Sequence, residues 1–327
     1  MPRAFVTGIT GQDGGYLAEQ LIAEGTEVHG LVRAGADEAV RSLQARAPKA
    51  VLHQGDLGDA DRLRGLVGEI QPDEVYNLAG VSSVAYSWRE PVLTAQLSGV
   101  AAAAVMEAAW KLQERTGRRV ACLQASSGEI FGRAALSPQD ESTPVRPVSP
   151  YGAAKAYAHH MAGAYRGRGL HVATCILFNH ESPRRPPAFV TRKITAAAAR
   201  IGADGSGVIR LGNLDARRDW GWAPDYVDAM VRALRYKVAD DFVVATGETH
   251  TVAEFAEAAL RHAGLGDHWR DHVEVDAQFM RPAEAPTLVG DAGKARKELG
   301  WGSTVRFEEV VSRMVDYDIE LLQRNQE

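Results

Sequence analysis

The sequence predicts a doubly wound α/β fold: a Rossmann-type parallel sheet with helices on both faces and a smaller α/β lobe at its carboxyl edge. Two observations predict it. Short apolar runs alternate with longer segments of helical periodicity through the first half of the chain, and a glycine-rich turn follows the first run. Strands separated by helices require right-handed crossovers, which give a parallel sheet covered on both faces.

The strands are expected from six short apolar runs that are bounded by turn-forming residues. In chain order these runs cover residues 4–7, 28–32, 50–53, 74–78, 120–125 and 172–178. Helical periodicity predicts three long helices between and after them, over residues 15–23, 91–115 and 307–322.

A change of rhythm after residue 178 predicts the division into domains. We expect residues 1–178 to form the sheet domain and 179–327 mainly the smaller lobe, with about 220–248 returning to the sheet domain. Pro, Arg and Gly cluster at 182–188 and 202–219, as in loops that cover the carboxyl edge of a parallel sheet.

Composition excludes several classes of protein. With 37 Lys and Arg against 42 Asp and Glu, the net charge is −5, which argues against a nucleic-acid partner. No run approaches the ~20 apolar residues of a membrane span, so a cytoplasmic protein is expected. Cys122 and Cys175 lie in apolar runs without metal-ligand spacing, so we expect reduced core cysteines and no metal site.

The turn after the first run carries Gly8, Gly11 and Gly14 at a spacing of three. Glycines there let the chain turn tightly and bring backbone N–H groups onto a pyrophosphate. The TGxxGxxG spacing resembles that of short-chain dehydrogenase/reductases. The sequence therefore predicts a dinucleotide site at the first strand–helix turn.

Two later positions refine this prediction. Arg33 ends the second run, where an acidic residue would bind a ribose 2′-hydroxyl and favour NAD. Arginine can instead pair with a 2′-phosphate, so NADP is expected rather than NAD. Asp56 and Leu57 follow the third run and are expected to receive the adenine ring.

A catalytic group is expected around Tyr151 and Lys155, whose spacing of four puts both side chains on one helix face. Lys155 can hold the ribose and lower the pKa of the Tyr151 phenol. Tyr151 would then exchange a proton with an alcohol while a hydride moves to or from nicotinamide. Ser127, at the end of the fifth run, would bond the substrate oxygen.

Glu129 adds a group that a simple dehydrogenase does not need. It lies two residues beyond Ser127, so a turn can direct both side chains toward one sugar ring. Oxidation of a ring carbon makes the neighbouring C–H acidic, and a carboxylate can then remove that proton.

Longer strings resemble the GDP-mannose 4,6-dehydratase family, extended short-chain dehydrogenase/reductases of the NAD-dependent epimerase/dehydratase superfamily. They include QASxxE at 124–129, NHESPRR at 179–185, GNLDAxRDW at 212–220 and RPAE at 281–284. The resemblance covers most of the chain. It implies a lyase that converts a GDP-hexose to its 4-keto-6-deoxy product by internal hydride transfer with loss of water, and a homodimer or homotetramer.

The resemblance also implies roles for individual residues. The reacting set would be Ser127, Glu129, Tyr151 and Lys155. The cofactor would contact Gly8, Thr10, Gly11, Gln12, Asp13, Gly14, Arg33, Asp56, Leu57, Leu78, Ala79, Gly80, Ser82, Tyr151, Lys155, His180 and Arg185. The nucleotide sugar would contact Ser83, Glu129, Asn179, Lys193, Arg218, Arg281 and Glu284.

Several positions depart from the family pattern. Ser127 stands where Thr is usual, Gly128 where Ser is common, and residues 81–84 replace AQSHV, so an altered sugar pocket is expected. The segment 34–53 is shorter than the family's loop that helps to build a tetramer. Another GDP-sugar, such as a GDP-heptose or GDP-N-acetylglucosamine, therefore stays open as substrate. So do a nucleotide-sugar epimerase or 4-keto-reductase on the same fold and a non-enzymatic cofactor-binding regulator.

Overall fold

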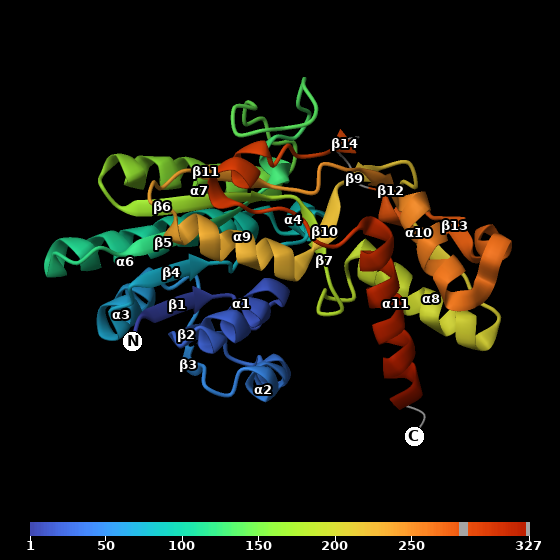
Figure 1. Cartoon of the computed structure of the whole chain (residues 1–327), viewed down its shortest axis with the longest axis horizontal. Coiled ribbons are helices and arrows are strands. Elements are labelled where there is room, and N and C mark those ends of the chain that lie inside the picture. Colours follow the sequence, from blue (N-terminus) through green and yellow to red (C-terminus); the bar gives the residue numbers. More distant parts are fainter. Residues whose placement is uncertain (281–286, 325–327) are drawn as a thin grey trace.

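The computed structural model describes residues 1–280 and 287–324 (Figure 1). All six expected strands form, with ends within two residues of the prediction. The strands are β1 (Arg3–Thr7), β2 (Glu27–Val32), β3 (Val51–Gln54), β4 (Glu74–Asn77), β5 (Ala121–Ser127), β6 (His171–Leu177), β7 (Asn179–Glu181), β8 (Ile209–Leu211), β9 (Arg217–Arg218), β10 (Trp220–Trp222), β11 (Asp241–Val244), β12 (His250–Thr251), β13 (Val273–Val275) and β14 (Thr287–Leu288).

The helices separate and follow these strands. The α-helices are α1 (Gln12–Ala23), α2 (Asp37–Arg46), α3 (Ala60–Ile70), α4 (Val84–Arg89), α5 (Pro91–Ala95), α6 (Ala101–Thr116), α7 (Pro150–Gly167), α8 (Val190–Asp204), α9 (Ala223–Arg235), α10 (Val252–Leu260) and α11 (Phe307–Arg324). Shorter helical turns are η1 (Gln96–Val100), η2 (Gly128–Ile130), η3 (Arg261–Leu265), η4 (Gly266–His272), η5 (Ala277–Phe279) and η6 (Ala295–Leu299).

The large sheet has the order β11-β6-β5-β4-β1-β2-β3, and every neighbouring pair is parallel. The chain order reverses direction between β1 and β4, so the carboxyl ends of these two strands border a crevice where ligands bind in such sheets. The outer strand β11 was not among the six predicted strands. It comes from the stretch 220–248, which also supplies α9 to one face of the sheet.

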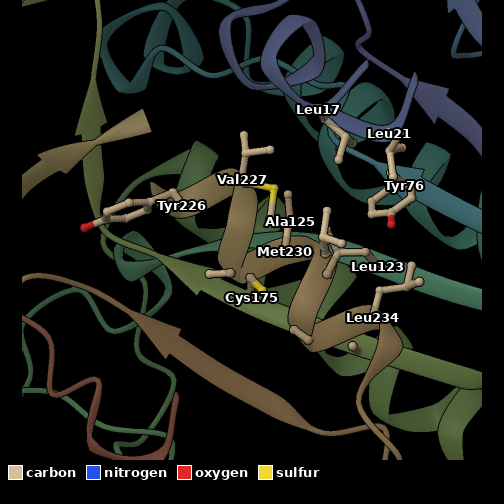
Figure 2. Close-up of a cluster of buried hydrophobic side chains, with 14 of the residues drawn as sticks. Leu17, Leu21, Tyr76, Leu123, Ala125, Cys175, Tyr226, Val227, Met230 and Leu234 are labelled. Carbon is tan, nitrogen blue, oxygen red and sulfur yellow. The ribbon is translucent and has the colours of Figure 1, made fainter. Parts of the chain in front are cut away.

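Apolar side chains cover both faces of the sheet. Figure 2 shows Val227, Met230 and Leu234 of α9 beside Leu123 and Cys175 of β5 and β6, within a core that also includes α1. A second core on the opposite face joins α3, α6 and α7. Both cysteines are free and buried, which confirms the expectation of reduced core residues.

Two helices differ from what the sequence pattern indicated. Helix α1 begins at Gln12 rather than 15, because Gly11 in extended conformation serves as its N-cap. The continuous helix 91–116 is long and apolar enough to cross a membrane by length and composition, although no such run was expected. Half of its apolar window is buried inside the molecule, and Val105, Met106 and Leu112 pack in the second core.

The smaller lobe lies at the right of Figure 1 and consists mainly of α8, α10 and α11 with short strands. Its core is separate from the two sheet cores and contains Ile194, Phe255 and Met314. The buried side chains of Arg192 and Asp318 form an ion pair that joins α8 to α11. This lobe therefore has its own core and an ion pair that ties two of its helices together.

Candidate active site

A cavity of about 670 Å³ lies between the carboxyl edge of the sheet and the smaller lobe. The four predicted reacting residues line it together, although they come from two separate segments, 127–129 and 151–155. Of the predicted site residues, those lining it are Asp13, Leu78, Ser82, Ser83, Ser127, Glu129, Tyr151, Lys155, Asn179, His180, Arg185, Lys193 and Arg218.

The start of α7 determines where Tyr151 lies. Ser149 caps the helix, because its hydroxyl accepts a hydrogen bond from the Gly152 N–H at 3.0 Å, and Pro150 occupies the first turn. The Tyr151 N–H donates to the hydroxyl of Ser87 at 3.2 Å. The sequence analysis did not identify Ser87, since only the tertiary structure brings α4 to the start of α7.

Burial is the largest cause of the pKa shifts of Tyr151 and Lys155. It raises the pKa of Tyr151 to about 12, against the lowering effect of a hydrogen bond with Ser127; the Glu129 charge raises it further. Burial also lowers the pKa of Lys155 to about 8. The Lys155 ammonium donates to the carbonyl of Ala125 at 2.9 Å and lies 5.9 Å from the Tyr151 ring centroid. The pKa of Tyr151 is therefore raised overall in the chain without ligands, because desolvation is the largest effect on the phenol.

Glu129 follows Ser127 in the short turn η2, and its N–H donates to the Ser127 hydroxyl at 3.3 Å. This turn brings both side chains to the cavity. Within the described residues, the Glu129 carboxylate has neither an ion pair nor a hydrogen bond. It is half-buried, and its oxygens are available to a bound ligand.

Of the positions expected to alter the sugar pocket, Ser127, Ser82, Ser83 and Val84 line the cavity, whereas Gly128 and Val81 do not. Gly128 faces the Phe178 ring, and a Cβ at this position would lie 3.1 Å from ring atoms. Val81 is also absent from the cavity wall, and its N–H donates to the Ser98 hydroxyl at 2.9 Å. The expected alteration of the sugar pocket therefore stays a prediction, which rests on Ser127 and on residues 82–84.

The glycine turn has the shape that a pyrophosphate requires. Gly8 has a φ of 75°, and a Cβ there would lie 2.9 Å from the Ala79 nitrogen. A Cβ on Gly14 would meet the Gly8 oxygen at 2.2 Å. Gly11 caps α1 without any side-chain hydrogen bond, which leaves the start of this helix open to an anion. These residues fit a dinucleotide cofactor.

A buried hydroxyl next to the reacting residues supports the same fit. Ser126 is 3% exposed and lines the cavity, yet its Oγ has no hydrogen-bond partner in the described parts of the chain. The Trp220 indole nitrogen is in the same situation. Buried polar groups are rarely unpaired, so a bound ligand is a natural partner for them. The Ser126-Ser127 pair in the sequence was the only signal for Ser126.

The remaining cofactor candidates lie outside this cavity, near the carboxyl ends of β1 to β4. Arg33 is exposed and has no ion pair among residues 1–280 and 287–324. The Asp56 carboxylate accepts a hydrogen bond from the Gly58 N–H at 2.7 Å, which is a local turn contact. Leu57 packs against the second core. The others outside the cavity are Gly8, Thr10, Gly11, Gln12, Gly14, Ala79 and Gly80.

Basic side chains surround the lobe side of the cavity. Lys193 lies 3.5 Å from the Phe279 ring centroid and donates to the Arg210 carbonyl at 2.5 Å. Arg218 is 5% exposed, and Arg185 pairs with the buried Glu181 at 3.2 Å. Positive charge there suits a diphosphate. The predicted substrate residues Arg281 and Glu284 lie outside the described residues.

The fold resembles that of solved nucleotide-sugar enzymes. The UDP-glucose 4-epimerase of Thermus thermophilus, solved in complex with NAD, is 26% identical, with a TM-score of 0.82 over 97% of this chain and 98% of that chain. Because epimerases and dehydratases share this fold, the fold alone does not distinguish their reactions.

Sequence comparison distinguishes them. Residues 5–314 match the family model of GDP-mannose 4,6 dehydratase. GDP-mannose 4,6 dehydratase 1 of Arabidopsis thaliana is 47% identical over 98% of this chain and 91% of the relative. The GDP-mannose 4,6 dehydratase of Homo sapiens is 41% identical over 98% of this chain and 92% of the relative. The chain therefore belongs to the GDP-mannose 4,6-dehydratase family.

Proposed function

We propose that this enzyme converts GDP-mannose to GDP-4-keto-6-deoxymannose with loss of one water, and that NADP is its internal hydride carrier. One observation carries the proposal: a full-length match to this family coincides with a cavity that Ser127, Glu129, Tyr151 and Lys155 line together. The Glu129 carboxylate, which pairs with none of residues 1–280 and 287–324, favours a dehydratase over a 4-keto-reductase, which needs no such base.

Specific residues are suited to hold the cofactor. The turn at Gly8, Gly11 and Gly14 would receive the pyrophosphate, and the exposed guanidinium of Arg33 would pair with the 2′-phosphate. The chemistry that a bound nicotinamide would supply is reversible hydride transfer, from C4 of the sugar and back to C6. Since the cofactor is regenerated, no net oxidation of the sugar occurs.

Tyr151 and Ser127 would act at the 4-hydroxyl. Tyr151 removes its proton as the C4–H bond breaks, and the carbonyl formed at C4 makes the C5 proton acidic. The Ser127 hydroxyl stabilises the phenolate by hydrogen bonding, in the direction that already lowers the Tyr151 pKa. The Lys155 ammonium on the same helix face adds a positive charge nearby.

Glu129 would carry out the elimination. Its carboxylate removes the C5 proton, and the resulting carboxylic acid protonates the C6 hydroxyl, which leaves as water. The electron pair of the broken C5–H bond forms the C5–C6 double bond. The later addition of a hydride at C6 and a proton at C5 completes the 4-keto-6-deoxy sugar. One carboxylate thus serves first as base and then as acid.

The diphosphate and ribose would lie against the lobe. Arg218 and Lys193 line that side, beside Asn179, and an arginine fork pairs bidentately with phosphate oxygens. We assign Arg281 to the same diphosphate and Glu284 to the ribose on the basis of the family strings. GDP-mannose is favoured over other GDP-sugars because the relatives at 41–47% identity are GDP-mannose 4,6 dehydratases.

Two further parts of the proposal concern the protein in its cell. We assign it to the cytoplasm, which is consistent with two free, buried cysteines. We also propose a homodimer or homotetramer, for which an exposed apolar surface on α5 to α7 is the support.

The deciding experiment is incubation with GDP-, UDP-, CDP- and dTDP-sugars, scored by mass spectrometry for loss of water. GDP-mannose should react, with no net change in reduced cofactor and with one solvent deuterium at C5 when the reaction runs in deuterium oxide. Net consumption of reduced cofactor would indicate a reductase. For the cofactor, Arg33→Glu should weaken NADP binding and leave NAD binding nearly unchanged.

A further inference from the structure

The phosphate-binding turn is tied to strand β7 by a group of four side chains, here called the clamp: Gln12, Asp13, His180 and Ser182. The Gln12 amide donates to the His180 carbonyl at 3.1 Å and accepts from the Ser182 hydroxyl at 2.8 Å. The Asp13 carboxylate contacts the His180 ring at 2.9 Å. Gln12, His180 and Ser182 are buried and Asp13 is partly buried.

The hydrogen bonds of His180 determine its charge. Its Nδ1 contacts the Phe178 carbonyl at 2.7 Å and its Nε2 contacts the Asp13 carboxylate at 2.9 Å. Both partners are acceptors, so both ring nitrogens carry hydrogen and the ring is an imidazolium. Burial opposes both charges, yet the pair overcomes it: the pKa of His180 lies above its ordinary value and that of Asp13 below it.

Other charged and titratable groups face this pair from each neighbouring element. The Arg185 guanidinium, after β7, disfavours the His180 cation and stabilises the Asp13 anion. Tyr226 of α9 stacks on the His180 ring at 4.6 Å, and Lys155 of α7 interacts with Asp13. Asp13 is thus the carboxylate that holds His180 as a cation.

The clamp leaves no ring nitrogen of His180 and no polar atom of the Gln12 side chain free for a ligand. We propose that Gln12, Asp13 and His180 are positioning residues: they hold the phosphate-binding turn against β7, the strand that carries Asn179, and so couple the cofactor site to the substrate site. This inference rests on the proposed function, because it concerns the affinity for the dinucleotide assigned there.

The physical reason is preorganisation. A glycine-rich turn has many accessible conformations, and binding must restrict them at a cost in entropy. Hydrogen bonds from adjacent residues to a strand of another segment remove part of this freedom before the cofactor arrives. Loss of the clamp should therefore weaken cofactor binding even where no ligand contact is removed.

The test compares Asp13→Asn and Ser182→Ala with the native protein and with Gln20→Ala, which removes an exposed hydrogen bond on the same helix. NADP and NAD affinities are measured by calorimetry on nucleotide-free protein between pH 5.5 and 8.5. We expect Asp13→Asn to weaken binding about tenfold, the loss growing as pH rises past ~6.5, where the released histidine gives up its proton. The native protein and Gln20→Ala should show no such pH dependence.

Ser182→Ala removes two neutral hydrogen bonds, one donated to Gln12 and one accepted from the Arg184 N–H, and should weaken binding by severalfold at every pH. Affinity in Asp13→Asn that equals the native value, or a loss that is independent of pH, would overturn the clamp. If the native protein binds neither nucleotide, the proposed cofactor fails; the pairing is then decided by NMR titration of His180, which must lose its proton at lower pH in Asp13→Asn.

Discussion

At the scale of single residues, the site keeps its acid and base groups in different environments. Tyr151 and Lys155 are buried, and burial moves both toward their neutral forms, with pKa values of about 12 and about 8. Glu129 is half-buried and has no protein partner in the described regions. A site with such a division can hold a proton on the phenol and keep a carboxylate ready to act as base.

Replacement of Glu129 by Gln tests this division. The amide has nearly the same shape but cannot remove a proton, so we expect turnover to fall by about 10²–10⁴-fold. Hydride transfer from C4 should persist, and reduced cofactor should accumulate in a single turnover. The measurement is stopped-flow absorbance together with deuterium incorporation at C5. Normal incorporation of deuterium at C5 would exclude Glu129 as the base.

Lys155 provides a prediction about stability. Its folded pKa of about 8 lies below the unfolded value, so between these values the unfolded chain binds more protons. Stability of the ligand-free protein should therefore rise with pH from about 8 to about 10, by up to roughly 3 kcal/mol from this group. Lys155→Met should remove that rise, while cofactor binding is lost. Urea denaturation of both proteins across this range gives the difference.

At the scale of elements, Asp219 joins three segments around the lobe side of the cavity. This fully buried carboxylate, between β9 and β10, accepts hydrogen bonds from the Thr246 N–H and Gly247 N–H, both at 2.9 Å. It also accepts from the Thr246 hydroxyl at 2.7 Å and the Gly290 N–H at 3.3 Å. Its neighbours Arg218 and Trp220 line the cavity, so the position of both depends on this carboxylate.

Asp219→Ala leaves these donors buried and unpaired, so we expect a loss of about 3 kcal/mol in the free energy of unfolding. A milder Asp219→Asn should keep part of the network and raise KM for the GDP-sugar more than it lowers kcat. Asp228→Ala is the control, because Asp228 forms an exposed ion pair with Arg232, worth about 0–1 kcal/mol. An equal loss of stability in Asp219→Ala and Asp228→Ala would contradict the role of Asp219.

At the scale of the whole molecule, the described part of the chain has an apolar surface that no other element of it covers. Val92 is 69% exposed, Val100 58% and Tyr157 47%. The Tyr157 ring packs beside Gly99, which brings the surfaces of η1 and α7 together. Apolar patches of this kind mark association surfaces, and two such helices from each copy could pack together.

Tyr157→Asp should therefore shift the protein from an oligomer toward a monomer, because it would place a charge in a buried interface. Light scattering after size-exclusion chromatography measures the mass, and circular dichroism checks that the fold is kept. Lys237→Gln, on the exposed surface beyond α9, is the matched control, because it also makes the charge more negative by one unit. A native protein that elutes as a monomer would contradict the proposed homo-oligomer.

Much of this architecture could be predicted from local sequence. Strand positions followed from short apolar runs, since a strand buried on both faces needs apolar residues throughout. The glycine turn and the Tyr151–Lys155 pair followed from spacing, because helix geometry places residues four apart on one face. Strand β11 was not predicted, although its apolar run, residues 242–245, is as long as the predicted run at 4–7.

Local pattern by itself determined the strands, the turn and the residue types that carry the chemistry, since each depends on neighbours a few positions away. Only the tertiary structure decided which groups meet. Asp13 and His180 are 167 positions apart in the sequence, and Ser87 and Tyr151 are 64 positions apart. The contact of Gly128 with the Phe178 ring also depends on how the folded chain packs. The pKa values of Tyr151 and Lys155 also follow from burial, which is a property of the folded chain.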